Sequence, residues 1–479
     1  MTRAEQLAAF VVRASYDDFS QVARQQLKTR VLDALGCAIG ALEGEPVRLV
    51  HQQVKEFGGA GHCTLIGGGR TAPDRAAFYN SALVRYLDFN DSYLAEGETC
   101  HPSDNLGAVL AAAEYAGRSG REVLTALAVA YQVQCRLSEV APVRAKGFDH
   151  TTQGSYAVAA GVSKALGLDQ LHTANALALS GTAFNALRIT RTGALSHWKG
   201  LAYPNTACGC THAAFLAMRG ITGPLEVFEG NKGFIDTIAG PFAIDWSQED
   251  LERVTRTVIK AYNAEVHSQA AIEGILELRR EHKFTPDDVT RIAVEIFDVA
   301  FHIIGGGEEG EKTRVWTKEE ADHSLPYLVA VALLDGQVMP EQYRPERIRS
   351  KDVQALLGKV RVQPLAAYSQ RFPEEMPCRL TVVLNDGRVL VKEKRDYEGF
   401  HTRPMRWETV VQKFERLSAP YTDAALRRHI TEVVANLEMR SVADLVRLLA
   451  QVQISLTKSE SYRAESREEK NHGSSRDAC

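Results

Sequence analysis

The sequence predicts a mainly α protein, in which a large all-helical domain carries a smaller α+β lid domain inserted before the C-terminal helices. Three observations predict this architecture. Segments rich in Ala and Leu with helical periodicity fill most of the first 270 residues. Strand-like segments appear only after that point, and helical periodicity resumes at Met405. With 479 residues, the chain is long enough for two or three domains.

The all-helical domain is expected to span residues 1–268. Its clearest helical segments are 22–42, 108–117, 121–140, 155–167 and 207–218. They are separated by helix-stopping residues, for example at Gly44-Glu45-Pro46 and at Ser103-Asp104. Because Ala and Gly are abundant on these segments, we expect the helices to pack closely in a bundle.

The α+β lid domain is expected over residues 269–402. Residues 291–297 and 360–362 have the composition of strands. Two further strand-like segments, 379–384 and 388–392, flank Asn385-Asp386-Gly387, which is a strong hairpin signal. Residues 321–334, which lie between the strand-like segments 291–297 and 360–362, return to a helical pattern.

The last part of the chain is predicted to return to the first domain. Helical patterns at 407–417, 423–437 and 442–452 define this returning segment, residues 403–456. Residues 457–479 contain five positive and five negative side chains and few apolar ones. Such a segment buries too little apolar surface to offset the entropy of ordering, so we expect a disordered tail.

Composition narrows the range of functions. The chain has 56 Lys and Arg against 60 Asp and Glu, a net charge of −4, which argues against a nucleic-acid binder but permits an anionic small substrate. No stretch approaches the ~20 apolar residues of a membrane span, and Glu5 interrupts any signal-peptide core. We therefore expect a cytoplasmic protein with no membrane partner.

The sequence offers no signal for a metal or a cofactor. The eight cysteines lack CxxC or iron–sulfur spacing and are expected to be reduced thiols. Cys208, Cys210 and His212 lie two apart, so on a helix they face different sides and cannot close on one ion. The glycine runs at 67–69 and 305–307 lack the context of a dinucleotide or phosphate loop.

Five polar patches are candidates for chemistry. In the first, a helical turn would place Asp88, Asp91 and Ser92 on one side, ahead of an irregular segment, 95–100, that ends at His101. Pro102 keeps His101 out of the helical conformation. Taken alone, each such residue is more typical of a structural role.

The other patches strengthen the case. They contain His150 (147–154), Lys199 (196–200), Lys260 and Glu265 (260–267), and Tyr327 (321–327). The first three patches each precede a helix rich in small residues, so three positive helix N-termini could point to one place. Such a place suits a polycarboxylate. The 260–267 patch joins the two domains, where a cleft is expected.

These motifs, in their order along the chain, resemble the MmgE/PrpD family, which contains 2-methylcitrate dehydratase and cis-aconitate decarboxylase. The likeness runs from about residue 31 to about residue 452, and its motifs are YLDFNDS, HPSD, GFDHTTQG, SHWKGLAYPN, KAYNAEVHSQ and ADHSLPYLVA. The resemblance implies a large all-helical domain, a smaller α+β lid inserted before the last helices, and a homodimer. It also implies pocket residues at Asp88, Ser92, His101, His150, Lys199, Lys260 and Tyr327.

The expected activity is that of a cofactor-independent hydro-lyase of propionate catabolism. It would dehydrate 2-methylcitrate, or a citrate-like hydroxy-tricarboxylate, to 2-methyl-cis-aconitate by acid–base elimination. Within the resemblance, Ala264-Glu265-Val266-His267 is similar to the dehydratase and differs from the Ala-His of the decarboxylase. Ser92 stands where the decarboxylase has Thr.

Roles are divided between two groups of residues. Asp88, His101 and His150 are the expected catalytic acid and base, with the order among them left open. The expected substrate-binding residues are Ser92, Lys199, Lys260, Glu265 and Tyr327. Among them, the ammonium groups of Lys199 and Lys260 would stabilise the negative charge that develops on the substrate when its proton is removed.

Two alternatives remain at this stage. A decarboxylase or epimerase of a related polycarboxylate would begin with the same carbanion character beside a carboxylate. A catalytically silent binding or structural homodimer would keep the fold without the activity. The joint presence of the pocket residues favours an enzyme. Two crossings between the domains, near 260–265 and 399–404, permit either a hinged lid or a rigid interface.

Overall fold

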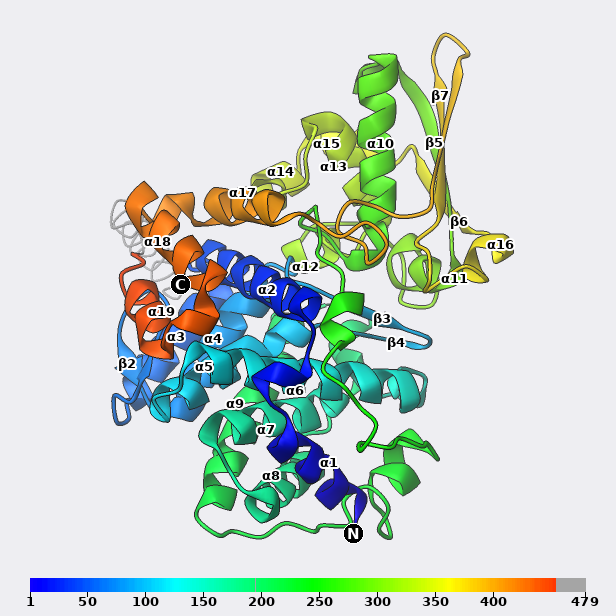
Figure 1. Ribbon diagram of the computed structural model, residues 1–479. Coiled ribbons are helices and arrows are strands. Elements are labelled where there is room, and N and C mark those ends of the chain that lie inside the picture. Colours follow the sequence, from blue (N-terminus) through cyan, green and yellow to red (C-terminus); the bar gives the residue numbers. More distant parts are fainter. Residues whose placement is uncertain (194, 454–479) are drawn as a thin grey trace, which may run out of the picture.

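The computed structural model describes residues 1–193 and 195–453. Its elements form a large helical part and a smaller part that contains the main sheet (Figure 1). We refer to residues 1–259 with 403–453 as the body, and to residues 260–402 as the cap. Each has its own hydrophobic core, one formed mostly by residues of 4–259 and 405–452 and the other by residues of 258–400. The mainly α fold class is confirmed, whereas the expected tail at 457–479 lies outside the described residues.

The body is a bundle of closely packed helices. Its helices before the cap are α1 (Arg3–Arg13), α2 (Gln21–Gly40), α3 (Glu45–Phe57), α4 (Pro73–Tyr86), α5 (Leu106–Tyr115), α6 (Gly120–Val140), α7 (Thr151–Leu166), α8 (Gln170–Ala183) and α9 (Trp198–Met218). Small residues allow the close approach. A Cβ added at Gly154 on α7 would lie 2.4 Å from the ring of Tyr203 on α9. The expectation of close packing is therefore met.

Two small antiparallel hairpins interrupt the body. They are β1 (Cys63–Thr64) with β2 (Arg70–Thr71), and β3 (Tyr93–Ala95) with β4 (Glu98–Cys100). The prediction of an irregular segment over 95–100 is therefore wrong, because Gly97, with φ of 78°, closes a tight turn there. The expected helical turn over 88–92 is also absent, since α4 ends at Tyr86 and Asp88 takes a φ of 55°.

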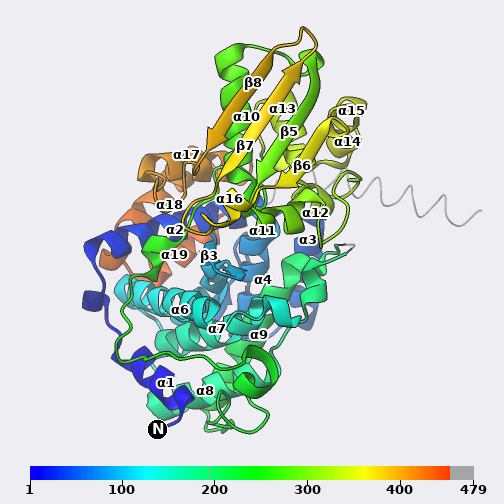
Figure 2. The same cartoon turned by 90° about the vertical axis from the view of Figure 1, so that its right-hand side faces the viewer.

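The cap is built on a four-stranded sheet in the order β6 (Val360–Pro364), β5 (Val289–Ile296), β7 (Cys378–Leu384) and β8 (Val389–Lys394). The β5–β6 pair is parallel and the others are antiparallel. The predicted hairpin is confirmed, with Val383 opposite Val389. Helices α10 (Gln269–His282) and α13 (Leu325–Asp335) contact the sheet, and Figure 2 shows them behind the strands. The shorter helices are α11 (Asp298–Ala300), α12 (Lys318–Ala321), α14 (Pro345–Ile348), α15 (Lys351–Leu357) and α16 (Ala366–Ser369).

After the cap, the chain returns to the body in three helices. These are α17 (Trp407–Ser418), α18 (Ala424–Ala435) and α19 (Val442–Leu449). Helix α17 packs along α2, and its inward face carries Val410, Phe414 and Leu417. A Cβ added at Gly36 of α2 would lie 3.1 Å from the backbone of Phe414, so the two helices approach closely at this point.

The two crossings between body and cap are hydrogen-bonded to each other and to the β3 hairpin. Ser92 and Val258 exchange two backbone hydrogen bonds of 2.9 and 2.8 Å. The next residue, Ile259, donates its N–H to the carbonyl of Gly399 at 2.9 Å. Gly399 has a φ of 116°, and a Cβ there would lie 2.1 Å from the Ile259 carbonyl oxygen, so only glycine fits.

No helix of the described residues has both the length and the apolar character that crossing a membrane requires.

Candidate active site

A cavity of about 50 Å³ lies where the body meets the cap. Its charged and titratable lining residues are Arg85, Arg144, Arg188, Arg191 and Lys260, with Asp88, Glu98, Glu265 and Glu309, and with His101, His150, His267 and His323. With neutral imidazoles, the lining has five cations against four carboxylates. This excess of positive charge suits an anionic ligand.

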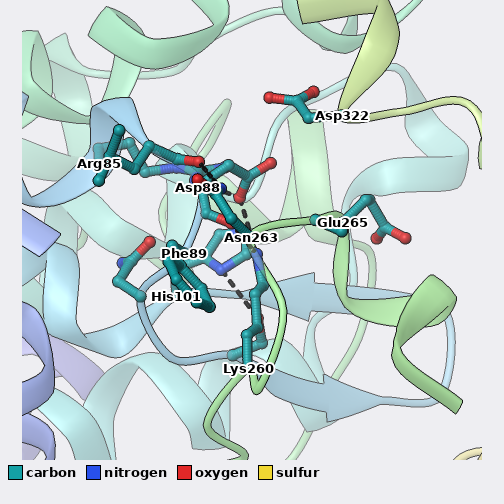
Figure 3. Close-up of polar contacts among 12 residues, drawn as sticks. Arg85, Asp88, Phe89, His101, Lys260, Asn263, Glu265 and Asp322 are labelled. Atoms are coloured by element: carbon teal, nitrogen blue, oxygen red, sulfur yellow. Dashed lines mark hydrogen bonds and ion pairs between the residues drawn. The ribbon is translucent and has the colours of Figure 1, made fainter. Parts of the chain in front are cut away.

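Asp88 lies at the centre of a buried ion-pair cluster. Its Oδ1 atom is 2.5 Å from Arg85 Nη1 and 2.8 Å from Lys260 Nζ, and its Oδ2 atom is 3.4 Å from Lys199 Nζ. Figure 3 shows the carboxylate between Arg85 and Lys260. Burial would raise the pKa of Asp88, but the cations, Arg85 and Lys260 above all, hold that pKa well below its ordinary value. Asp88 is therefore a fixed anion and a weak proton acceptor.

A second carboxylate extends this cluster into the cap. Asp322 Oδ1 is 2.7 Å from Lys199 Nζ, and Asp322 Oδ2 is 2.7 Å from Lys318 Nζ. His323 Nδ1 lies 3.0 Å from the Lys199 ammonium. Asp88, Asp322 and His323 have the spacing of metal ligands, but lysines already pair with both carboxylates. We interpret the group as an ion-pair network that joins body and cap.

His101 is held with a defined ring orientation. It directly follows β4, and its Nδ1 atom lies 2.9 Å from the Asp91 carbonyl oxygen and 3.0 Å from Ser92 Oγ. Because a carbonyl oxygen only accepts, Nδ1 carries the proton and Nε2 holds a free lone pair. Burial, together with Arg85 and Lys260, keeps the pKa of His101 well below 6.5. The ring is therefore a neutral base that lines the cavity.

His150 stands beside it at the N-terminus of α7. The two rings are 5.4 Å apart between centroids, in an edge-to-face arrangement. His150 Nδ1 lies 3.3 Å from Asp149 Oδ1, and Arg191 Nε lies 2.9 Å from the other oxygen of that carboxylate. Among the described residues, nothing hydrogen-bonds to the buried Nε2 atom of His150. Burial lowers the pKa of His150, and Asp149 opposes that shift.

Glu265 and His267 form a pair on the opposite wall, where the chain enters the cap. Glu265 Oε1 is 2.7 Å from His267 Nδ1, and Oε2 accepts the His267 backbone N–H at 2.8 Å. Although burial raises the pKa of Glu265, His267 outweighs it and lowers that pKa to about 2. Both side chains line the cavity, with Glu265 ionised.

The site residues predicted from the sequence either line the cavity, lie behind its wall or lie away from it. Five line the cavity directly: Asp88, His101, His150, Lys260 and Glu265. Lys199 and Ser92 lie behind the wall, because Lys199 pairs with Asp88 and Ser92 contacts His101. Tyr327 does not line the cavity. Its hydroxyl donates to the Gln342 carbonyl within the cap core, because α13 is buried almost all round.

Four arginines line the cavity that the sequence analysis did not predict there: Arg85, Arg144, Arg188 and Arg191. Arg85 lies one helical turn before Asp88, a spacing that signals an ion pair. Arg188 and Arg191 lie in one short helical turn, and nothing in the sequence around them distinguishes this turn from any other that carries basic residues. Arg144 follows a loop with no motif. Their convergence depends on packing between segments far apart in sequence.

Comparison with known proteins agrees with this architecture. The model of the MmgE/PrpD N-terminal domain matches residues 5–247, and that of the MmgE/PrpD C-terminal domain matches residues 262–439. A 2-methylcitrate dehydratase of Salmonella typhi is 27% identical over 81% of this chain and 84% of that protein. A mitochondrial 2-methylcitrate dehydratase of Yarrowia lipolytica is 28% identical over 83% of this chain and 80% of its own length. A cis-aconitate decarboxylase of Mus musculus is 25% identical over 88% of each chain. The two domain matches cover most of the sequence, and the chain therefore belongs to the MmgE/PrpD family.

Proposed function

We propose that the cavity catalyses the reversible loss of water from 2-methylcitrate, or a closely related hydroxy-tricarboxylate, to give 2-methyl-cis-aconitate. One observation carries the proposal. His101 and His150 lie 5.4 Å apart, each fixed through Nδ1, within a wall of arginine and lysine side chains. Two adjacent imidazoles supply the base and the acid that an elimination needs. The names of the Salmonella and Yarrowia relatives support the same reaction.

In this mechanism His101 is the base. Its Nε2 lone pair takes the proton from the carbon next to a substrate carboxylate, and the C–H electron pair becomes the new C=C bond. Arg85 and Lys260, which lie close enough to lower the pKa of His101, stabilise the negative charge that develops at that carboxylate. Asp88 takes no proton here and instead positions these two cations.

His150 is the acid. A bound substrate carries about three negative charges, because carboxylates titrate near 4. That charge raises the pKa of His150 in the complex, and Asp149 supports the imidazolium form through Nδ1. The Nε2 proton then passes to the departing hydroxyl, which leaves as water. The site resets when His101 releases its proton and His150 regains one from solvent.

Decarboxylation is the second candidate, because the Mus musculus relative is named for it. Dehydration is favoured because Ala264-Glu265-Val266-His267 is similar to the dehydratase motif and differs from the Ala-His of the decarboxylase. The test offers purified protein 2-methylcitrate, citrate and cis-aconitate separately. Dehydration raises enoate absorbance, decarboxylation releases carbon dioxide, and an epimerase changes only the stereochemistry seen by NMR. Absence of turnover with all three would contradict the proposal.

We also propose that the enzyme is a cytoplasmic homodimer in which the cap acts as a lid domain. The seven cysteines among the described residues are free thiols, as is usual in a reducing compartment. Leu187, Ile189 and Trp198 expose large apolar surfaces close together in sequence on the body. Light scattering that gives a monomeric mass would contradict the dimer.

A further inference from the structure

One end of the cavity contains two arginines that share a single carboxylate. Arg188 Nη2 lies 2.5 Å from Glu309 Oε1, and Arg144 Nη2 lies 3.4 Å from the same oxygen. Both arginines belong to the body, whereas Glu309 belongs to the cap. All three side chains are largely buried and line the same cavity as His101. Glu309 therefore closes the cavity at this end across the boundary between body and cap.

The arginines need an anion in this position. Burial lowers the pKa of Arg144, and the nearby Arg188 lowers that pKa further, whereas Glu309 opposes both effects. Among the described residues, Glu309 is the only carboxylate recorded within ion-pair distance of the Arg144 side chain. Arg188 has a second, longer contact of 3.8 Å with Asp149, which already serves Arg191 and His150.

Glu309 is carried by a segment that can release it. Gly306, with φ of 104°, and Gly310, with φ of 97°, flank it closely. Its backbone is held by one hydrogen bond, from the Glu309 N–H to the His302 carbonyl at 3.0 Å. Its neighbour Glu308 is exposed to solvent. The carboxylate is thus buried on a short segment that lies between two glycines with positive φ.

We infer that Arg144 and Arg188 form a subsite for one carboxylate of the substrate, and that Glu309 occupies this subsite until the substrate displaces it. The inference rests on the proposed function, since it assigns one substrate carboxylate to a place in that cavity. Two guanidinium groups around one oxygen are a common receptor for a carboxylate. Exchange of the Glu309 carboxylate for a substrate carboxylate keeps both arginines paired, so only the loop has to move. Glu309 then selects for ligands that carry enough negative charge to compete with it.

The test measures binding of propane-1,2,3-tricarboxylate, which has no hydroxyl group to eliminate, by isothermal titration calorimetry. Glu309→Gln removes the competing charge and keeps the size of the side chain. We expect this variant to bind the tricarboxylate roughly 5- to 10-fold more tightly, the equivalent of about one typical hydrogen bond. The matched control, Glu308→Gln, removes an exposed charge one residue away and should leave the affinity unchanged. Arg188→Met should weaken binding and abolish the gain from Glu309→Gln in the double variant.

The outcomes separate this inference from the proposed reaction. Equal or weaker binding by Glu309→Gln would overturn it, because Glu309 would then be inert or would orient the arginines for the substrate. Absence of binding by the wild type and every variant would overturn it as well. Tighter binding by Glu309→Gln, together with no turnover of 2-methylcitrate, would keep the subsite and refute the dehydratase. Thermal unfolding of each variant establishes that it is folded.

Discussion

The Lys413 ammonium on α17 lies 3.0 Å from the backbone carbonyl oxygen of Lys260 and donates a hydrogen bond to it. The same group donates to the Phe89 carbonyl at 2.8 Å and lies 3.7 Å from the centre of the Phe89 ring. Its counter-ion is Asp33 of α2, at 2.7 Å. Lys413 thus links the segment that carries Asp88 to the segment that carries Lys260, from a helix that touches neither side chain. It is a positioning residue for the cluster.

Replacement of Lys413 by Met should lower both activity and stability. Asp33 is left as an unpaired buried charge, which costs about 3–5 kcal/mol in comparable cases. The added change Asp33→Asn should recover much of the stability but little of kcat/KM, because the Phe89 and Lys260 carbonyls still lack their donor. Thermal unfolding and steady-state kinetics measure the two effects. Arg416→Met, on the exposed face of α17, is the control, and full recovery of activity in the double variant would contradict the positioning role.

Replacement of His101 by Ala should lower kcat by at least ~100-fold, the usual effect of losing a general acid–base group. Ser92→Ala should cost far less, because the Asp91 carbonyl still accepts the Nδ1 proton and keeps the ring in place. Steady-state kinetics on folded variants checks the pair. Near-normal turnover by His101→Ala, or equal losses in both variants, would refute the assigned base.

The acid limb of kcat/KM should have its midpoint below pH 6.5. Burial and the cations Arg85 and Lys260 lower the pKa of His101, so the base stays unprotonated, and active, to a lower pH than an exposed histidine. Lys260→Met removes one of these cations and should move the midpoint upward while lowering the rate. A pH series of kcat/KM on both proteins measures this, and a wild-type midpoint at or above 6.5 would contradict it.

Replacement of Tyr327 by Phe should reduce stability by about 1 kcal/mol, the net worth of a typical hydrogen bond, and leave kcat and KM nearly unchanged. The hydroxyl donates to the Gln342 carbonyl inside the cap core and does not reach the cavity. Chemical denaturation and kinetics separate the two effects. A large loss of activity with unchanged stability would instead place the hydroxyl on the substrate, as the family resemblance implied.

Much of the fold could be predicted because its signals are local. Helical periodicity and Asn385-Asp386-Gly387 depend on a few neighbouring residues, and the structure contains the corresponding helices and hairpin. The β3–β4 hairpin was missed because strands of three residues are too short for an alternating pattern. Its only signal is Gly97, which lies between the apolar Tyr93-Leu94-Ala95 and the more polar Glu98-Thr99-Cys100.

The site was harder to predict, because its geometry depends on contacts between distant segments. Motifs indicated His101, His150 and Lys260, but of the three cations around Asp88 only Arg85 lies at a spacing in the sequence that signals the pair. The subsite formed by Arg144 and Arg188 with Glu309 brings together three short segments that share no sequence pattern. A side chain that faces the cavity and one that supports the wall look alike in sequence, which is why Ser92 and Tyr327 were grouped with the residues that line it.

The hydrogen bonds between the two crossings couple any movement of the cap to the residues that line the cavity. Val258 is paired with Ser92, Ile259 with Gly399, and the next residue is Lys260. Any rotation of the cap would therefore pull on the segment that leads to Lys260 and on Ser92, which contacts His101. Ions that pair across the boundary, such as Lys199 with Asp322, would part in the same movement. A movement that opens the cavity would therefore also separate the ion pairs across the boundary. The proposed catalytic groups would then be aligned only while the cavity is closed.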